Sequence, residues 1–102
     1  MNITKNYNEK ELTMTIEGRV DTITSHDLEK EINDELDNFN SLTLDFTDLE
    51  YISSAGLRVL IATQKKLKSD NIPFVIKNVN ATVSEIFRMS GFDKILTIEW
   101  TQ

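Results

Sequence analysis

The strictest alternation of polar and apolar residues lies near the start of the chain, over residues 11–17. Its apolar members are Leu12, Met14 and Ile16. Because successive side chains of a strand point to opposite faces, this alternation predicts a strand with one buried face. Residues 2–7 are expected to pair with it as a hairpin through the polar turn at 8–10, and Gly18 ends the hairpin region.

Three further strands are expected later in the chain, over residues 42–46, 74–77 and 96–100. In the first and last of them the apolar residues again alternate with polar ones; these are Leu42, Leu44 and Phe46, then Leu96, Ile98 and Trp100. Pro73 stands just before the middle strand, where its missing amide hydrogen is tolerated.

Three stretches with apolar residues at helical spacing predict three helices. The stripe of the first helix consists of Leu28, Ile32, Leu36 and Phe39. Its start is predicted at a capping box formed by Thr24 and Asp27. The second helix is expected from about residue 54 to 68 or 69, and the third begins after an Asn80 cap and stops at Gly91.

The expected elements follow the order β-β-α-β-α-β-α-β. Strands separated by a single helix favour parallel neighbours with right-handed crossovers. One apolar stripe on each helix means that each helix covers the sheet from one side. The pattern therefore predicts one α/β domain over residues 1–102, with a mixed sheet of four to five strands and about three helices packed on one side.

Composition narrows the classes of function. A length of 102 residues fits one domain, and the absence of cysteine excludes disulfides and thiolate metal sites. No signal peptide and no membrane-length apolar run is visible, so we expect a cytoplasmic protein without a membrane span. The net charge of −6, from 17 acidic and 11 basic residues, argues against nucleic-acid binding and favours protein partners.

Ser53 and Ser54 stand where the chain enters the second helix. The commoner role of a serine there is capping, because its hydroxyl accepts a hydrogen bond from a backbone amide two or three residues on. Free amides at a helix start also stabilise an added anion, so a phosphate on Ser54 could be carried without unfolding the domain. It would add about −1.5 to −2 charges. Close in sequence to Asp45, Asp48 and Glu50, it is expected to repel a docked partner.

A nucleophilic serine is the alternative chemistry at this point. It needs a base within hydrogen-bond reach, and His26 is the only histidine. Because His26 is expected in the first, solvated turn of a helix, a catalytic pair of Ser54 and His26 is not favoured. Asp21 could meet Asp45 and Asp48 at one end of the sheet, but capping or solvation explains each of them better. No phosphate-binding glycine loop or metal-ligand spacing is present, so we expect no catalytic residue, cofactor or metal.

Three segments resemble the STAS domain family, and within it the bacterial anti-sigma factor antagonists. They are residues 44–60 (LDFTDLEYISSAGLRVL), 18–21 (GRVD) and 86–92 (IFRMSGF). They stand in the family's order and span nearly the whole chain, and the first is the most specific. The resemblance implies a single STAS-type domain over residues 1–102.

The resemblance also implies a partner-switching protein and not an enzyme. In this family the unphosphorylated antagonist binds an anti-sigma factor that is also a serine kinase; phosphorylation abolishes binding, and a PP2C-type phosphatase restores it. The family's phosphorylated serine maps to Ser54, and an acidic position near it maps to Asp21. The residues then expected to contact the partner are Asp21, Thr22, Ser53, Ser54, Ala55, Gly56, Leu57 and Arg58. The free protein is expected to be a monomer.

Two departures from the family pattern keep alternatives open. Ser53 stands where the family often has an aspartate, which makes Ser53 a second candidate for phosphorylation. Ala55 stands where the family often has serine or threonine. An alternative is therefore a STAS binding module of a lipid-transport or stress-signalling complex that is not regulated by phosphorylation.

Overall fold

The computed structural model describes residues 1–99 of the chain. Its elements are β1 (Asn2–Asn8), β2 (Glu11–Val20), α1 (Thr24–Asp34), β3 (Ser41–Asp45), β4 (Leu49–Ile52), α2 (Ser54–Ser69), β5 (Phe74–Lys77), α3 (Ala81–Ser90), the 3-10 helix η1 (Phe92–Lys94) and β6 (Ile98–Glu99). Trp100, predicted in the last strand, lies outside the described residues. No helix within residues 1–99 has the length and apolar character that crossing a membrane requires.

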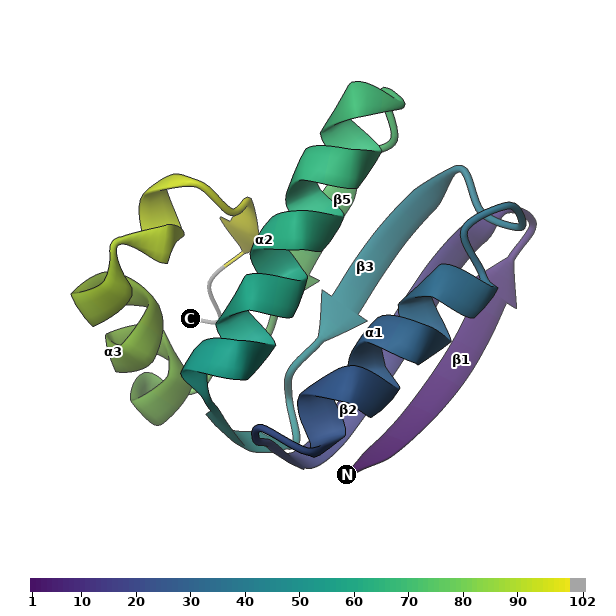
Figure 1. Cartoon of the computed structure of the whole chain (residues 1–102). Helices are drawn as coiled ribbons and strands as arrows, with labels where there is room; N and C mark the ends of the chain where they lie inside the picture. The colour runs from purple at the N-terminus through teal and green to yellow at the C-terminus, as the bar shows by residue number, and fades with distance from the viewer. Residues whose placement is uncertain (100–102) are drawn as a thin grey trace.

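All six strands join in one mixed sheet (Figure 1). Five of them follow the order β1-β2-β3-β5-β6, and β4 pairs with β2 off this path. β1 and β2 are antiparallel, whereas the other pairs are parallel. The predicted mixed sheet with three helices is confirmed, and β4 brings the strand count above the predicted four to five.

β2 is long enough to pair with two strands in succession. Its residues from Glu11 to Thr15 pair with β3, and its last residues pair with β4. The register shifts between Gly18 and Arg19, where Gly18 has a φ of 96° that residues with side chains rarely adopt. After β3 the chain can therefore turn and pair with β2 a second time, as strand β4.

α1 and α2 lie side by side across one face of the sheet, and α3 packs against β4 (Figure 1). The helices and this face of the sheet share one apolar core. Its fully buried members include Leu12, Met14, Ile16, Leu28, Ile32, Leu42, Leu44, Leu60 and Ile76. Residues between them in the strands, such as Thr13, Thr15 and Thr43, are polar and half-buried, as expected for a sheet with one solvated face.

α1 ends earlier than its apolar stripe predicts. The helix stops at Asp34, and residues 35–38 form turns. The prediction that Leu36 and Phe39 continue the helical stripe is therefore wrong, although Phe39 is buried in the core. Asp and Asn at 37–38 favour a turn, and the last turn of the helix carries no basic residue to stabilise its end.

Both ends of α3 confirm their predictions. The Asn80 side-chain oxygen accepts a hydrogen bond from the Val83 amide at 2.8 Å, and Gly91 adopts the left-handed conformation with a φ of 77°. The Asn80 side-chain nitrogen also donates to the Leu49 carbonyl at 2.7 Å. One side chain therefore starts α3 and ties it to β4.

Candidate functional site

The candidate site lies where β2 and β4 end side by side. Val20 stands opposite Ile52 in this parallel pair, and the Ser53 amide donates to the Val20 carbonyl at 2.8 Å. The residues that follow the two strands therefore meet at one edge of the sheet, next to the start of α2. We call this region the Ser54 edge; it consists of Asp21, Thr22, Ser53, Ser54, Ala55 and Arg58.

Ser53 is the N-cap of α2. Its backbone is extended, with φ −85° and ψ 172°, and its hydroxyl accepts a hydrogen bond from the Gly56 amide at 3.2 Å. Its carbonyl accepts from the Leu57 amide at 2.9 Å. The side chain is half-buried. Ser53 therefore performs the structural role that the sequence left open between the two serines.

Ser54 is the first residue of α2 and is exposed. Within residues 1–99 its hydroxyl has no hydrogen bond, and the amides of Ser54 and Ala55 have no acceptor. Unbonded amides are normal in the first turn of a helix, and they give this point a positive partial charge. Ser54 thus presents an exposed hydroxyl without a hydrogen bond, whereas the Ser53 hydroxyl caps the helix.

Asp21 organises the loop between β2 and α1. One oxygen of its carboxylate accepts from the amides of Ile23 and Thr24 at 2.9 and 2.8 Å and from the Thr24 hydroxyl at 3.0 Å. The Asp21 amide donates back to the Thr24 hydroxyl at 2.8 Å. Hydrogen bonds from the Thr24 amide and hydroxyl lower the pKa of the Asp21 carboxyl below its usual value. The carboxylate is therefore ionised and held at the Ser54 edge.

This network corrects the predicted start of α1. The residues that bond reciprocally are Asp21 and Thr24, and the predicted box of Thr24 and Asp27 is wrong. Both pairs have the same spacing, so the pattern alone could not choose between them. What decides is the end of β2, because it leaves Asp21 beside the first amides of the helix.

Gly56 and Leu57 lie inside the fold. A Cβ atom on Gly56 would stand 2.6 Å from Ile52 Cγ1 and 2.7 Å from Val20 Cγ1, so only glycine fits here. Leu57 is buried in the core. These two of the predicted partner-contacting residues therefore set the position of the α2 start, and the exposed members of the predicted set are Asp21, Thr22, Ser54 and Arg58.

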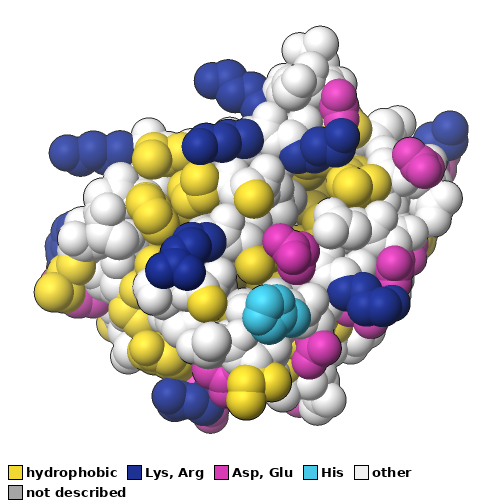
Figure 2. Space-filling view, viewed as in Figure 1, with side chains coloured by type: hydrophobic (Ala, Val, Ile, Leu, Met, Phe, Trp, Pro, Cys, Tyr) yellow, Lys and Arg dark blue, Asp and Glu magenta, His cyan; other side chains and the backbone are white. Residues whose placement is uncertain are grey.

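A shallow groove runs from the Ser54 edge between α1 and α2. It has a volume of about 360 Å³ and is lined by Thr22, Ser25, His26, Glu29, Ala55, Arg58, Val59 and Ala62. Figure 2 shows acidic, basic and histidine side chains together over these helices. Among the described residues, Ser54 and His26 share no hydrogen bond, so the structure does not assemble the alternative catalytic pair.

The STAS domain family matches residues 2–101, which is nearly the whole chain. This protein belongs to the STAS domain family. Among its relatives is BtrV of Bordetella bronchiseptica, classed with the anti-sigma factor antagonists; it is 33% identical over 88 residues, which cover 85% of this chain and 76% of BtrV. The anti-sigma-F factor antagonist RsfB of Mycobacterium tuberculosis is 29% identical over 82 residues, covering 79% of this chain and 66% of RsfB.

Solved structures confirm the fold of this STAS domain. The unphosphorylated form of the anti-sigma factor antagonist SpoIIAA superposes with a TM-score of 0.84 at 13% identity, covering 99% of this chain and 89% of SpoIIAA. Its phosphorylated form, from Bacillus, superposes with a TM-score of 0.77 at 12% identity, covering 99% and 92% of the two chains.

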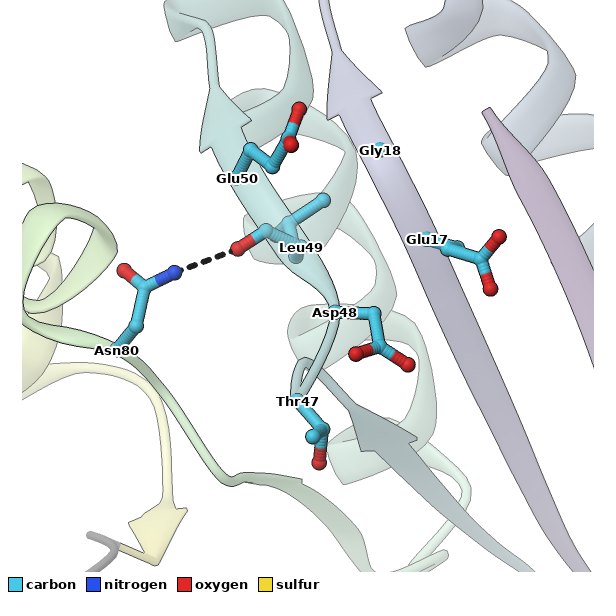
Figure 3. A pocket seen from close by; sticks show the side chains of 7 residues that line it. All are labelled: Glu17, Gly18, Thr47, Asp48, Leu49, Glu50 and Asn80. Carbon is cyan, nitrogen blue, oxygen red and sulfur yellow. Dashed lines mark hydrogen bonds between the residues drawn. The ribbon is translucent and has the colours of Figure 1, made fainter.

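The acids close to Ser54 in sequence are carried away from it in this STAS domain. Asp45 accepts hydrogen bonds from Thr47 and Asn78. Asp48 and Glu50 line a different hollow of about 580 Å³ together with Glu17, and their carboxylates point apart (Figure 3). Asp48 precedes β4 and Ser54 follows it, and a strand of four residues spans roughly 13 Å.

This placement changes the electrostatic expectation for Ser54. Asp21 does not meet Asp45 and Asp48, and residues 1–99 contain no cluster of His, Cys, Asp or Glu that could hold a metal. The charged groups of the Ser54 edge and its groove are Asp21, Glu29 and Arg58, with His26 beside them.

Sequence reasoning missed Ile23, which is 77% exposed in the Asp21 loop, because nothing in an isolated loop residue signals its exposure.

Proposed function

We propose that this STAS protein is an anti-sigma factor antagonist. In the proposal, its unmodified form binds an anti-sigma factor that has serine kinase activity, and phosphorylation of Ser54 ends the complex. The observation that carries the proposal is the exposed, unbonded Ser54 hydroxyl on the first residue of α2. The similarity to BtrV and RsfB supports the kind of partner.

The geometry favours Ser54 over Ser53 as the phosphorylated residue. A kinase needs an accessible hydroxyl, and Ser54 is exposed whereas Ser53 is half-buried. The Ser53 hydroxyl also accepts a hydrogen bond from Gly56, so modifying it would disturb the cap of α2. Ser53 therefore remains the second candidate.

A phosphate on Ser54 is compatible with the folded domain. The free amides of Ser54 and Ala55 and the positive end of the α2 dipole both favour an anion there. SpoIIAA, whose fold this chain shares, is known in phosphorylated and unphosphorylated forms. The phosphate would therefore change the surface that binds the partner and leave the fold of this domain intact.

The proposed partner surface is the exposed part of the Ser54 edge. A phosphate adds about −1.5 to −2 charges beside the ionised Asp21 carboxylate. It also needs space and hydration where a tightly packed partner would exclude water. Removal by a PP2C-type phosphatase would restore the binding surface.

Phosphorylation can be mapped directly. The purified protein is incubated with ATP and the anti-sigma kinase of the same organism, and the modified residue is identified by mass spectrometry. We expect phosphate on Ser54, none in Ser54→Ala, and unchanged labelling in Ser53→Ala. Phosphate on Ser53, or on neither serine, would contradict the proposed site.

Partner binding is tested separately with the same kinase. Ser54→Ala should bind it whether or not ATP is present, whereas Ser54→Asp should bind it weakly and melt like the wild type. A protein that binds no anti-sigma factor but copurifies with transporter components would instead favour the alternative STAS module.

A further inference from the structure

Arg58 differs from the other two arginines of the chain. The guanidinium of Arg19 lies 4.6 Å from the centre of the Tyr51 ring, and Arg88 forms an ion pair with Glu85. Arg58 is exposed, and within residues 1–99 the structure gives it no ion pair, hydrogen bond or ring contact. An unpaired, exposed arginine at the rim of the groove is free to bind an anionic group.

Neither Glu29 nor Asp21 forms an ion pair with Arg58. Glu29 lines the same groove from α1, but no ion pair joins it to Arg58. The Asp21 carboxylate already accepts three hydrogen bonds from its own loop. Arg58 therefore has no competing partner among the described residues around it.

Ser54 and Arg58 are four residues apart on the continuous helix α2. Side chains at this spacing are neighbours on one face of a helix. Helical side chains also lean toward the N-terminus, which points Arg58 back over the turn that holds Ser54. The planar guanidinium fork matches phosphate oxygens, which lysine does only as a point charge.

We propose that Arg58 is the counter-ion of the phosphate on Ser54. In the unmodified protein its guanidinium contributes to the partner surface, where it suits an acidic group of the anti-sigma factor. After phosphorylation the Arg58 guanidinium binds the phosphate along the same face of α2. The modification therefore removes the partner's contact with Ser54 and its contact with Arg58 together. This inference rests on the proposed function, and its first test needs neither the kinase nor the partner.

The first test measures the ionisation of the phosphate itself. Phosphoserine is incorporated at position 54 during translation, and its second pKa is followed by ³¹P NMR titration. Loss of the arginine in Arg58→Gln should raise this pKa by about half a unit, since the dianion loses its cation. Arg58→Lys should raise it less.

Arg88→Gln is the matched control, because it removes an exposed arginine of the same charge from α3. It should leave the phosphate pKa at the wild-type value. His26 lines the same groove, so the series is repeated in His26→Gln, which removes its imidazole. Equal pKa values in Arg58→Gln and Arg88→Gln would overturn the proposal.

The second test is a binding cycle with the anti-sigma factor. Arg58→Gln should weaken the unmodified complex about fivefold, and it should reduce the loss caused by phosphorylation by about threefold or more. If Arg58→Gln and phosphorylation weaken the affinity for the anti-sigma factor independently of each other, the proposal is also overturned. If phosphorylation leaves wild-type binding unchanged, the proposed function fails, and the NMR titration still decides the role of Arg58.

Discussion

Two polar regions lie at opposite ends of α1 and differ in how completely their groups are paired. Near its C-terminal end, Lys5 contacts Glu31 at 2.5 Å and Glu35 at 3.2 Å, and the Tyr7 hydroxyl donates to Glu35 at 2.6 Å. Near its N-terminal end, the Ser54 edge holds a serine and an arginine without partners among residues 1–99. We call the first region the β1–α1 cluster.

Polar groups of the first region hold the fold together, whereas Ser54 and Arg58 in the second region are free to bind a partner. The β1–α1 cluster joins the edge strand to a helix, and each of its charged groups has a partner inside the molecule. The Ser54 edge is equally well positioned, but by Asp21, Ser53 and Gly56, whose bonds and packing are internal. Side chains that are held in position but have no partner inside the molecule are suited to binding another protein.

The largest expected effect comes from breaking the support of the Ser54 edge. Gly56→Ala places a methyl group against Ile52 and Val20, whose buried, branched side chains cannot move away easily. We expect the free energy of unfolding, measured in urea, to fall by about 2 kcal/mol, despite alanine's better helix propensity.

Gly91→Ala is the control for Gly56→Ala. It has open space around the added methyl and only the strain of its positive φ, so it should lose about 1 kcal/mol or less. If Gly56→Ala is as stable as the wild type, the close approach of α2 to the two strands is not as described.

A smaller effect should follow from loosening the Asp21 loop. Thr24→Val removes the hydroxyl that accepts from the Asp21 amide, and loss of a cap costs about 1 kcal/mol. Urea unfolding measures this loss, and binding of the anti-sigma factor should weaken with it. Thr22→Val changes an exposed hydroxyl in the same loop and serves as the control for the stability measurement. If the two variants are equally stable, the hydrogen bonds between Asp21 and Thr24 do not hold the Ser54 edge in place.

The smallest effect concerns the β1–α1 cluster at high pH. Partial burial and the hydrogen bond to Glu35 raise the pKa of Tyr7 from 10.0 to about 12. Since the folded protein holds this proton more tightly than the unfolded chain, its stabilisation is complete below pH 10 and is lost as the pH rises toward 12. Lys5, whose pKa is also raised, chiefly by its hydrogen bond to Glu31, acts in the same direction.

Tyr7→Phe isolates the tyrosine from Lys5. Between pH 9 and about 12, the Tm of this variant should fall less steeply with pH than the Tm of the wild type. Below pH 9 the Tm values of the two proteins should depend on pH in the same way. Parallel curves across the whole range would show that Tyr7 does not contribute through its proton.

The sequence predicted the features that depend on neighbouring residues. Alternation at Leu12, Met14 and Ile16 located the first core strand, and Asn80 and Gly91 marked the ends of α3. These signals are local, because side-chain period and cap chemistry act over a few residues. They were also sufficient to place Ser54 at the start of a helix.

The features that were missed depend on contacts between distant segments. β4 exists because β2 continues past Gly18 and offers it a partner, which four residues cannot show by themselves. The choice between Asp21 and Asp27 as the partner of Thr24 depends on where β2 ends. The separation of Asp48 from Ser54 depends on the length of β4, so nearness in sequence misled the electrostatic prediction.

We propose that Ser54 controls partner binding, whereas Ser53 only caps α2. The most direct test is isothermal titration of the anti-sigma factor with three forms of the protein: unmodified, phosphoserine at position 54, and Ser53→Ala. We expect phosphoserine at 54 to weaken binding about 100-fold, and Ser53→Ala to weaken it no more than a few-fold. Unchanged affinity with the phosphate at position 54 would contradict the claim.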